Sequence, residues 1–382
     1  MKQILVSRDN NNKCRVVQIE TAWVEDHYEI YRKSGLLNGK ITSGPTIIVK
    51  PKVKRNHEEQ CELEFNSHVK KYLDKGYKTI ESLGHTSLDT FNPKTDLPEL
   101  SVDQNGAIKP MLCLVYDPKD KKSQGIKWLA SRKLDGLRMS IYMKDGKLCT
   151  SSRGGKDYNV AATYILQDAF IKQLLTDNPG LILDGELYRH GWQLQKISGL
   201  GRLESLHEDH KYLRFYCYDI VDLKKTFKER LEILRSIKPT WNSLLTMVEH
   251  VEVEGNENID ALHDKWVAEG YEGLVLRDPD QLYKPLAKDR RQQKVKKFID
   301  AEFKVIGFSE GLREEDFVFR CITSDGKEFE AKPIGDRHLK KWYREHMDEL
   351  IGEMATVKYF NLTPDGIPNL PTLRSFRIKK DI

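Results

Sequence analysis

One short segment combines residues that could do chemistry on a phosphate: Lys133-Leu134-Asp135-Gly136-Leu137-Arg138. A lysine attacks only as the free amine, and neighbouring cations or burial can lower its pKa enough to populate that form near neutral pH. An arginine nearby offers a fixed fork of donors to a phosphate. The segment therefore suggests an enzyme that carries a nucleotide on Lys133. A solvated, charge-rich turn is the alternative interpretation of the segment taken alone.

Further motifs follow this segment in order, and each is weak by itself. They are Ser152-Arg153-Gly154, Leu183-Asp184-Gly185-Glu186-Leu187, Phe215-Tyr216-Cys217-Tyr218-Asp219, Glu272-Gly273-Leu274-Val275-Leu276-Arg277 and Lys294-Val295-Lys296-Lys297. Their order and spacing resemble the nucleotidyltransferase motifs of the covalent superfamily that comprises ATP-dependent DNA ligases, RNA ligases and mRNA capping enzymes. Compact viral or bacterial DNA ligases are the nearest comparison.

The resemblance implies that Lys133 attacks the α-phosphate of ATP, releases pyrophosphate and holds AMP through a phosphoramidate. Asp135, Glu186 and Glu272 match carboxylates that orient the ribose or hold a metal. Glu186 and Glu272 are the expected metal ligands. The expected ion is Mg²⁺, with Mn²⁺ as a substitute, because such ions take one or two carboxylates and keep several waters.

The same resemblance assigns the cationic and aromatic residues. Arg138 and Arg153 would bind ribose hydroxyls or phosphate, and Lys294 and Lys296 would stabilise charge on the α-phosphate. Alternation along one strand places both lysines on the same face. Phe215 matches a position that stacks on adenine, although it lies in an apolar run and could instead belong to the core.

The C-terminal region predicts short strands at 303–308, 317–322, 329–332 and 355–360, with a hairpin turn at Ser324-Asp325-Gly326-Lys327 and one helix spanning 339–350. This content fits a five-stranded barrel of the oligonucleotide-binding (OB) type. The closing stretch resembles the basic motif with which DNA ligases contact pyrophosphate. Its candidates are Arg374, Arg377 and Lys379, and a solvated basic tail is the alternative.

Residues 1–85 predict a small basic α+β module that binds DNA. Extended segments are expected around residues 14–22 and 28–32, and Cys61, Phe65, Val69 and Leu73 repeat at helical spacing. The module resembles the WGR domain of poly(ADP-ribose) polymerases, although tyrosine and arginine replace the naming tryptophan and glycine. An unrelated DNA-binding module is the alternative. Its candidate phosphate contacts are Lys50, Lys52, Lys54 and Arg55.

Composition and patterning give the domain organisation. A chain of 382 residues exceeds what one core usually supports. We expect an α+β multidomain protein: the module at 1–85, a linker at 86–108, an ATP-grasp-like adenylyltransferase domain at 109–298 with antiparallel sheets flanked by helices, and the OB barrel at 299–382. A strand should follow Lys133, because apolar residues alternate from Leu137 to Met143, and the lysine should lie in the turn before it.

The resulting hypothesis is an ATP-dependent DNA ligase that seals nicked or broken duplex DNA in repair, replication or recombination. An RNA ligase, a GTP-dependent capping enzyme and a catalytically silent nucleic-acid-binding protein are the alternatives. No apolar run is long enough for a membrane span and the start lacks a signal peptide, so we expect a monomer in the cytoplasm of a bacterium or of an infected host cell. Dispersed cysteines predict neither zinc nor disulfides.

Overall fold

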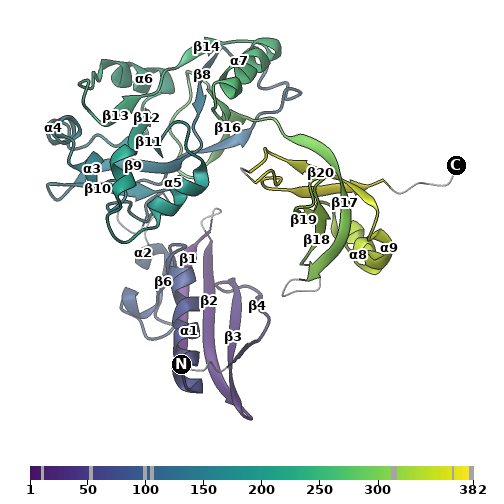
Figure 1. Cartoon of the computed structure of the whole chain (residues 1–382). Coiled ribbons are helices and arrows are strands. Elements are labelled where there is room, and N and C mark those ends of the chain that lie inside the picture. The colour runs from purple at the N-terminus through teal and green to yellow at the C-terminus, as the bar shows by residue number, and fades with distance from the viewer. Residues whose placement is uncertain are drawn as a thin grey trace. The chain divides into compact units, whose positions relative to one another are not determined.

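The computed structural model describes residues 1–9, 13–50, 55–97, 101–103, 107–310, 316–363 and 365–377. The chain forms two compact units, residues 1–296 and 297–382. The first unit contains an N-terminal sheet and two central sheets, and the second is built on a barrel (Figure 1). The finer division of the first unit at residues 85 and 108 stays a prediction. Within the described ranges, no helix is long and apolar enough to cross a membrane.

The N-terminal sheet is six-stranded, and helix α1 (His57–Leu73) packs on it (Figure 1). Its strands are β1 (Lys2–Arg8), β2 (Cys14–Val24), β3 (His27–Leu36), β4 (Ile41–Ser43), β5 (Ile47–Val49) and β6 (Lys78–Thr79). As the spacing predicted, α1 buries Cys61, Phe65 and Val69. The polar beginning of the chain concealed β1, which pairs with β2 and β6 and buries Leu5 and Val6 completely.

The segment expected to be a linker is partly packed on this sheet. It contains the short helix α2 (Pro93–Asp96), and Phe91 and Leu97 are buried in one cluster with Val6 and Val16. Apolar side chains separated by polar residues can anchor a segment in this way without producing a helical or strand period. The start of this segment therefore belongs to the N-terminal sheet's second core.

Two five-stranded sheets form the central region. One has the order β10-β9-β11-β12-β13, with bounds Lys147–Ser152, Leu137–Lys144, Leu183–Tyr188, Arg214–Ile220 and Leu245–Met247. The other has the order β14-β8-β15-β16-β7, with bounds Val251–Val253, Trp128–Lys133, Gly273–Arg277, Lys288–Val295 and Leu112–Val115. Pairs β12–β13 and β16–β7 are parallel, so the sheets are mixed rather than antiparallel throughout.

Helices flank these sheets: α3 (Thr163–Leu166), α4 (Ala169–Asp177), α5 (Leu194–Gly201), α6 (Phe227–Ser236) and α7 (Asn256–Ala268). The strand expected after Lys133 is confirmed as β9. The expectation that Lys133 lies in a turn is wrong, because it is the last residue of β8. Strand β8 lies between β14 and β15, where both faces can be covered, and its sequence therefore lacks a clear alternation.

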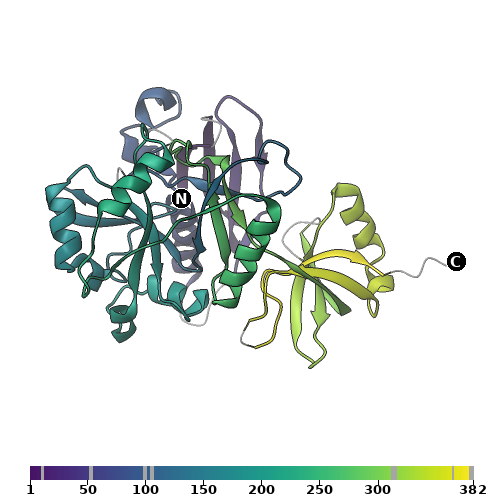
Figure 2. The ribbon, with the colours of Figure 1, turned by 90° about the horizontal axis from the view of Figure 1, so that it is seen from above.

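The second unit is a closed barrel of five strands in the order β17-β18-β19-β21-β20 (Figure 2). Their bounds are Ile299–Glu310, Phe317–Ile322, Glu328–Pro333, Thr372–Phe376 and Met354–Tyr359. The expected hairpin turn is present, with Gly326 in the left-handed region at φ 85°. The single helix expected here is divided at His346 into α8 (Arg337–Glu345) and α9 (Met347–Leu350).

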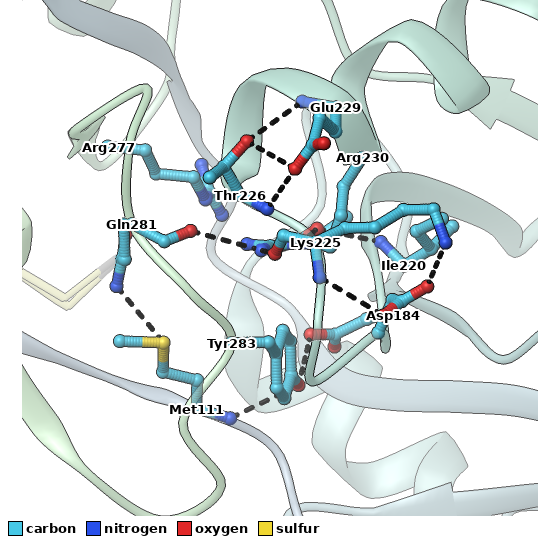
Figure 3. A network of polar contacts seen from close by, with 12 residues as sticks. Met111, Asp184, Ile220, Lys225, Thr226, Glu229, Arg230, Arg277, Gln281 and Tyr283 are labelled. Atoms are coloured by element: carbon cyan, nitrogen blue, oxygen red, sulfur yellow. Dashed lines mark hydrogen bonds and ion pairs between the residues drawn. The ribbon is translucent and has the colours of Figure 1, made fainter.

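A buried ion pair fastens β12 to α6. Arg230 is completely buried, and its Nε and Nη2 atoms donate to the two carboxylate oxygens of Asp219 at 2.7 and 3.1 Å. Its Nη1 donates to the carbonyls of Lys225 and Gln281, so the whole guanidinium is engaged (Figure 3). A buried charge of this kind is stable only while its partners remain.

We predict that Asp219→Ala lowers the free energy of unfolding by about 3 kcal/mol or more, because it leaves the Arg230 charge buried without a counter-ion. Urea unfolding of the purified protein measures this. Lys225→Met, which breaks the exposed pair with Asp222, is the control and should change stability much less. Equal losses in the two variants would contradict the assignment.

Candidate active site

Glu272 lies between two lysines on neighbouring strands. Strand β15 pairs with β8 so that Gly273 is opposite Lys133, and the Glu272 N–H donates to the Lys133 carbonyl. The Glu272 side chain, 7% exposed, receives the Nζ of Lys133 on one oxygen and that of Lys296 on the other, the latter at 2.9 Å. A Cβ at Gly273 would lie 2.3 Å from the Val295 carbonyl, so this close strand approach requires glycine.

The other central sheet supplies a second set of polar groups. Strands β9 and β11 place Arg138 opposite Glu186. The Arg138 guanidinium donates through Nε and Nη2 to both oxygens of the buried Asp184, at 2.6 and 2.5 Å. Tyr218 donates to the Glu186 carboxylate at 3.2 Å. Gly136 allows these strands to meet, because a Cβ there would lie 2.6 Å from a carbonyl of β11.

Tyr283 holds Asp184, the carboxylate that binds Arg138, in place. Its hydroxyl donates to Asp184 at 2.8 Å and accepts from the backbone N–H of Met111 at 3.1 Å (Figure 3). The ring is buried, so the hydroxyl has little freedom to rotate away. Asp184 is therefore held on both sides, and the orientation of Arg138 is fixed before any ligand binds.

The electrostatics favour an ammonium on Lys133 in this structure. Burial lowers its pKa, but the attraction and hydrogen bond of Glu272 outweigh burial, so that the pKa is raised. Burial raises and both lysines lower the pKa of Glu272, with a net decrease. Burial and then the charges of Lys296 and Lys133 lower the pKa of Lys294. The lowered pKa that the sequence led us to expect is thus found at Lys294 and not at Lys133.

The two other carboxylates are shifted in the opposite sense. Burial raises the pKa of Glu186 to about 7, despite the opposing attraction of Lys133 and Arg138. Burial and the repulsion of Glu272 raise the pKa of Asp135. The charges of Glu186 and Glu272, the expected metal ligands, both raise the pKa of Lys133. Among the described residues, no group of three or more His, Cys, Asp and Glu side chains could hold a metal ion.

Phe215 was assigned wrongly from the sequence. It has no exposed surface and packs in the large central core, so its ring presents no face to a ligand. Tyr218 was missed, although it alternates with Cys217 and so points to the face opposite the core. The Arg138 guanidinium lies 5.0 Å from the centre of its ring, and its hydroxyl contacts Glu186. Tyr218, which is 7% exposed, is therefore an aromatic residue in contact with both Arg138 and Glu186.

The remaining candidates lie in other parts of the chain than Lys133, Glu272 and Lys296, or outside the described residues. Arg153 is exposed in the turn after β10. Arg374 and Arg377 belong to the second unit, where they pair with Asp300 and Glu302 of β17. In the N-terminal module, Lys50 and Arg55 are exposed. The other three candidates, Lys52, Lys54 and Lys379, lie outside the described residues.

Comparison with known proteins gives consistent matches over the central region. The sequence model of the family described as the ATP-dependent DNA ligase domain matches residues 110–297. A DNA ligase of African swine fever virus (Warthog isolate) is 27% identical over 289 residues, which cover 69% of this chain and 67% of the viral protein. A DNA ligase of Enterobacteria phage T3 is 26% identical over 175 residues, covering 43% of this chain and 50% of the phage protein.

A solved structure shares the fold. A Lig E DNA ligase superposes with a TM-score of 0.56 at 20% identity, covering 71% of this chain and all of that one. The matched family region contains Lys133, Glu186, Glu272, Lys294 and Lys296, and ion pairs join Lys133 and Lys296 to Glu272. The chain therefore contains an ATP-dependent DNA ligase domain at residues 110–297.

Proposed function

We propose that the chain seals breaks between a 5′-phosphate and a 3′-hydroxyl in duplex DNA by three displacements at phosphorus. Lys133 Nζ attacks the α-phosphorus of ATP: an N–P bond forms, the bond to pyrophosphate breaks and the amine loses a proton. AMP then passes from Lys133 to the 5′-phosphate, and the 3′-hydroxyl finally displaces AMP. The carrying observation is the partly buried cluster of Lys133, Glu272 and Lys296, in which the charge of Glu186 also acts on Lys133.

The attack requires Lys133 to lose both its ion pair and a proton. Its burial lowers the pKa, and the attraction and hydrogen bond of Glu272 are the largest influences that raise it. Engagement of Glu272 by another cation would weaken this opposition to burial and favour the free amine. Glu272 is thus a restraint that keeps the nucleophile charged and inactive until the site is filled.

Glu186 and Glu272 are the residues that would hold Mg²⁺ together with substrate phosphates and water. The bound ion would neutralise charge on the α-phosphate and on the leaving pyrophosphate. Lys294 lies near the end of β16, Lys296 directly follows this strand, and both would bind the phosphoryl oxygens. Burial and then the charges of Lys296 and Lys133 lower the pKa of Lys294. In this proposal the two lysines bind phosphate directly, without a complete set of protein ligands for a metal ion.

The nucleotide itself would be oriented by Arg138 and Tyr218. The Arg138 fork is fixed by Asp184, leaving its remaining N–H groups for a ribose hydroxyl or phosphate. The aromatic face of Tyr218 suits a purine, and Glu186 suits the ribose hydroxyls. Asp135 completes this set beside Lys133.

The second unit is proposed to be an OB barrel that contacts DNA and, during lysine adenylation, the pyrophosphate. Its closed five-stranded barrel supports this proposal. Arg374, Arg377 and Lys379 are the candidate pyrophosphate contacts. The ion pairs of Arg374 and Arg377 with β17 would have to open, which is feasible because both arginines are substantially exposed.

The N-terminal module is proposed to bind duplex DNA as an accessory, WGR-like domain within a monomeric enzyme. Lys50 and Arg55 flank the short basic stretch from β5 to α1. Exposed cations at this density neutralise phosphates without reading the base sequence.

The first prediction from this mechanism concerns the nucleophile. Lys133→Ala should gain no adenylate with ATP and Mg²⁺ and should seal no nicked DNA, because it lacks the attacking amine. Intact-protein mass spectrometry and a sealing assay measure the two outcomes, with GTP and a nicked RNA duplex as parallel arms. Lys172→Ala, an exposed lysine on α4, is the control and should behave as wild type. An adenylate that persists in Lys133→Ala would refute the assignment.

A second prediction uses the raised pKa of Glu186. The folded protein keeps a proton up to about pH 7 that the unfolded chain, with a pKa near 4.5, has released. The free energy of unfolding should therefore fall as pH rises from 4.5 to about 7 and then level off. Glu186→Gln carries no charge and should escape this loss, so its stability relative to wild type should increase over that range.

Urea unfolding across this pH range measures the effect. The exposed Glu204 provides the matched control, and Glu204→Gln should retain the pH dependence of wild type. If the free energies of unfolding of Glu186→Gln and wild type change in parallel at all pH values, Glu186 does not titrate as proposed.

A third prediction tests the basic stretch. Lys50→Ala/Arg55→Ala should weaken binding to nicked duplex DNA and reduce the slope of log affinity against log salt by about 0.9 for each phosphate that the variant no longer neutralises. Lysine adenylation by ATP should be unchanged. The charge-matched control is Lys172→Ala/Lys238→Ala, two exposed lysines on the central region. Equal slopes for the two double variants would remove DNA binding from this stretch.

A further inference from the structure

A segment that precedes the central sheets in the chain contacts the end of β10 and the turn that carries Arg153. Ser101–Asp103 pairs antiparallel with Ala107–Lys109: the Asp103 N–H donates to the Ala107 carbonyl at 2.8 Å, and the Lys109 N–H donates to the Ser101 carbonyl at 2.7 Å. A bridge between Val102 and Ile108 completes the pairing. This short hairpin lies in the segment expected to be a linker.

The hairpin directs a buried carboxylate toward the end of β10. Asp103 is 5% exposed, although nothing in the expected mechanism uses it. One oxygen accepts the Ser151 hydroxyl at 2.5 Å and the other accepts the Ala107 N–H at 3.0 Å. A buried carboxylate that accepts several hydrogen bonds is strongly fixed in place, because losing them would leave it unsolvated.

The same carboxylate sets the path of the turn that follows. Residues 152–156 close a tight turn in which the Gly155 N–H donates to the Ser152 carbonyl at 3.0 Å. Gly155 has φ 84°, and a Cβ there would lie 2.9 Å from the Asp103 Cβ. The turn therefore packs directly on Asp103, and Gly155 permits both the backbone conformation and the close approach.

Arg153 is the exposed cation carried by this turn, and it has no ionic partner among the residues that the structure describes. We propose that Asp103 is a positioning residue: by holding Ser151 and the turn at Gly155, it aims the Arg153 fork at a substrate phosphate. This inference rests on the proposed ligase function and on the phosphate contact that the motif resemblance implies for Arg153. The phosphate can belong to ATP or to the DNA strand, and the separate reaction steps distinguish these sources.

The experiment compares Asp103→Ala, Arg153→Ala and the double variant in single-turnover assays. Lysine adenylation, AMP transfer to nicked DNA and final sealing are measured separately. Arg153→Ala should slow one step, adenylation if the phosphate is that of ATP and transfer or sealing if it is that of DNA. Asp103→Ala should slow the same step by about tenfold, because misplacing a binding group by a fraction of an ångström has effects of this size. The double variant should be no slower than Arg153→Ala alone.

Milder variants keep the test valid if Asp103→Ala does not fold. Asp103→Asn retains the acceptor for Ala107 and can donate to the Ser151 hydroxyl, so it should restore most of the rate. Ser151→Ala should slow the same step by a smaller factor. The control is Asp157→Asn, an exposed carboxylate in the same loop, which should match wild type.

Three results would overturn the proposal. Asp103→Ala could slow a different step from Arg153→Ala, or the double variant could combine the two rate losses by multiplication. Asp103→Ala could also lower the thermal stability while keeping wild-type rates at a permissive temperature. Failure of the wild-type protein to form an adenylate would instead overturn the proposed function. The two hypotheses therefore fail in different assays.

Discussion

Glu272 bridges Lys133 and Lys296, and the geometry of three adjacent strands depends on this pair of contacts. Without the carboxylate, two ammonium groups would face each other in a partly buried site, where their repulsion is poorly screened. The contact requires β15 to run close between β8 and β16, which in turn requires glycine at position 273. One interaction thus links strand order, glycine placement and the protonation of the nucleophile.

Further contacts in the central region form a chain in which each functional side chain is held in place by the next one. Asp184 fixes Arg138, and Tyr283 fixes Asp184. Farther back, Asp219 and Arg230 attach β12 to α6, so the sheet that carries these groups is itself anchored. Such support reduces the reorganisation that substrate binding would otherwise require. The arrangement explains why a site rich in charge can be stable although several of its groups are buried.

The sequence predicted the kind of chemistry better than it predicted which residues contact each other. Motif order identified Lys133, Glu186 and Glu272 because each motif keeps its local residue pattern, and the strand after Lys133 followed from simple alternation. It did not reveal β1, whose polar ends conceal two buried residues, or the division of the helix at His346. Phe215 was misplaced because an apolar run does not say which of its faces meets the core. Asp103 was missed because one of its partners, Ser151, lies 48 positions away in the chain.

The hydrogen bond from Met111 to Tyr283 has a consequence for how the catalytic region can be delimited. Met111 lies where the chain enters the first strand of the central sheets, yet its backbone N–H belongs to the support of Arg138. A fragment that began at Leu112 would keep every strand of the two central sheets and every nucleotidyltransferase motif while losing this donor. The N-terminal boundary of the catalytic region is therefore set by a buried hydrogen bond that requires Met111, and not by the first residue of a strand.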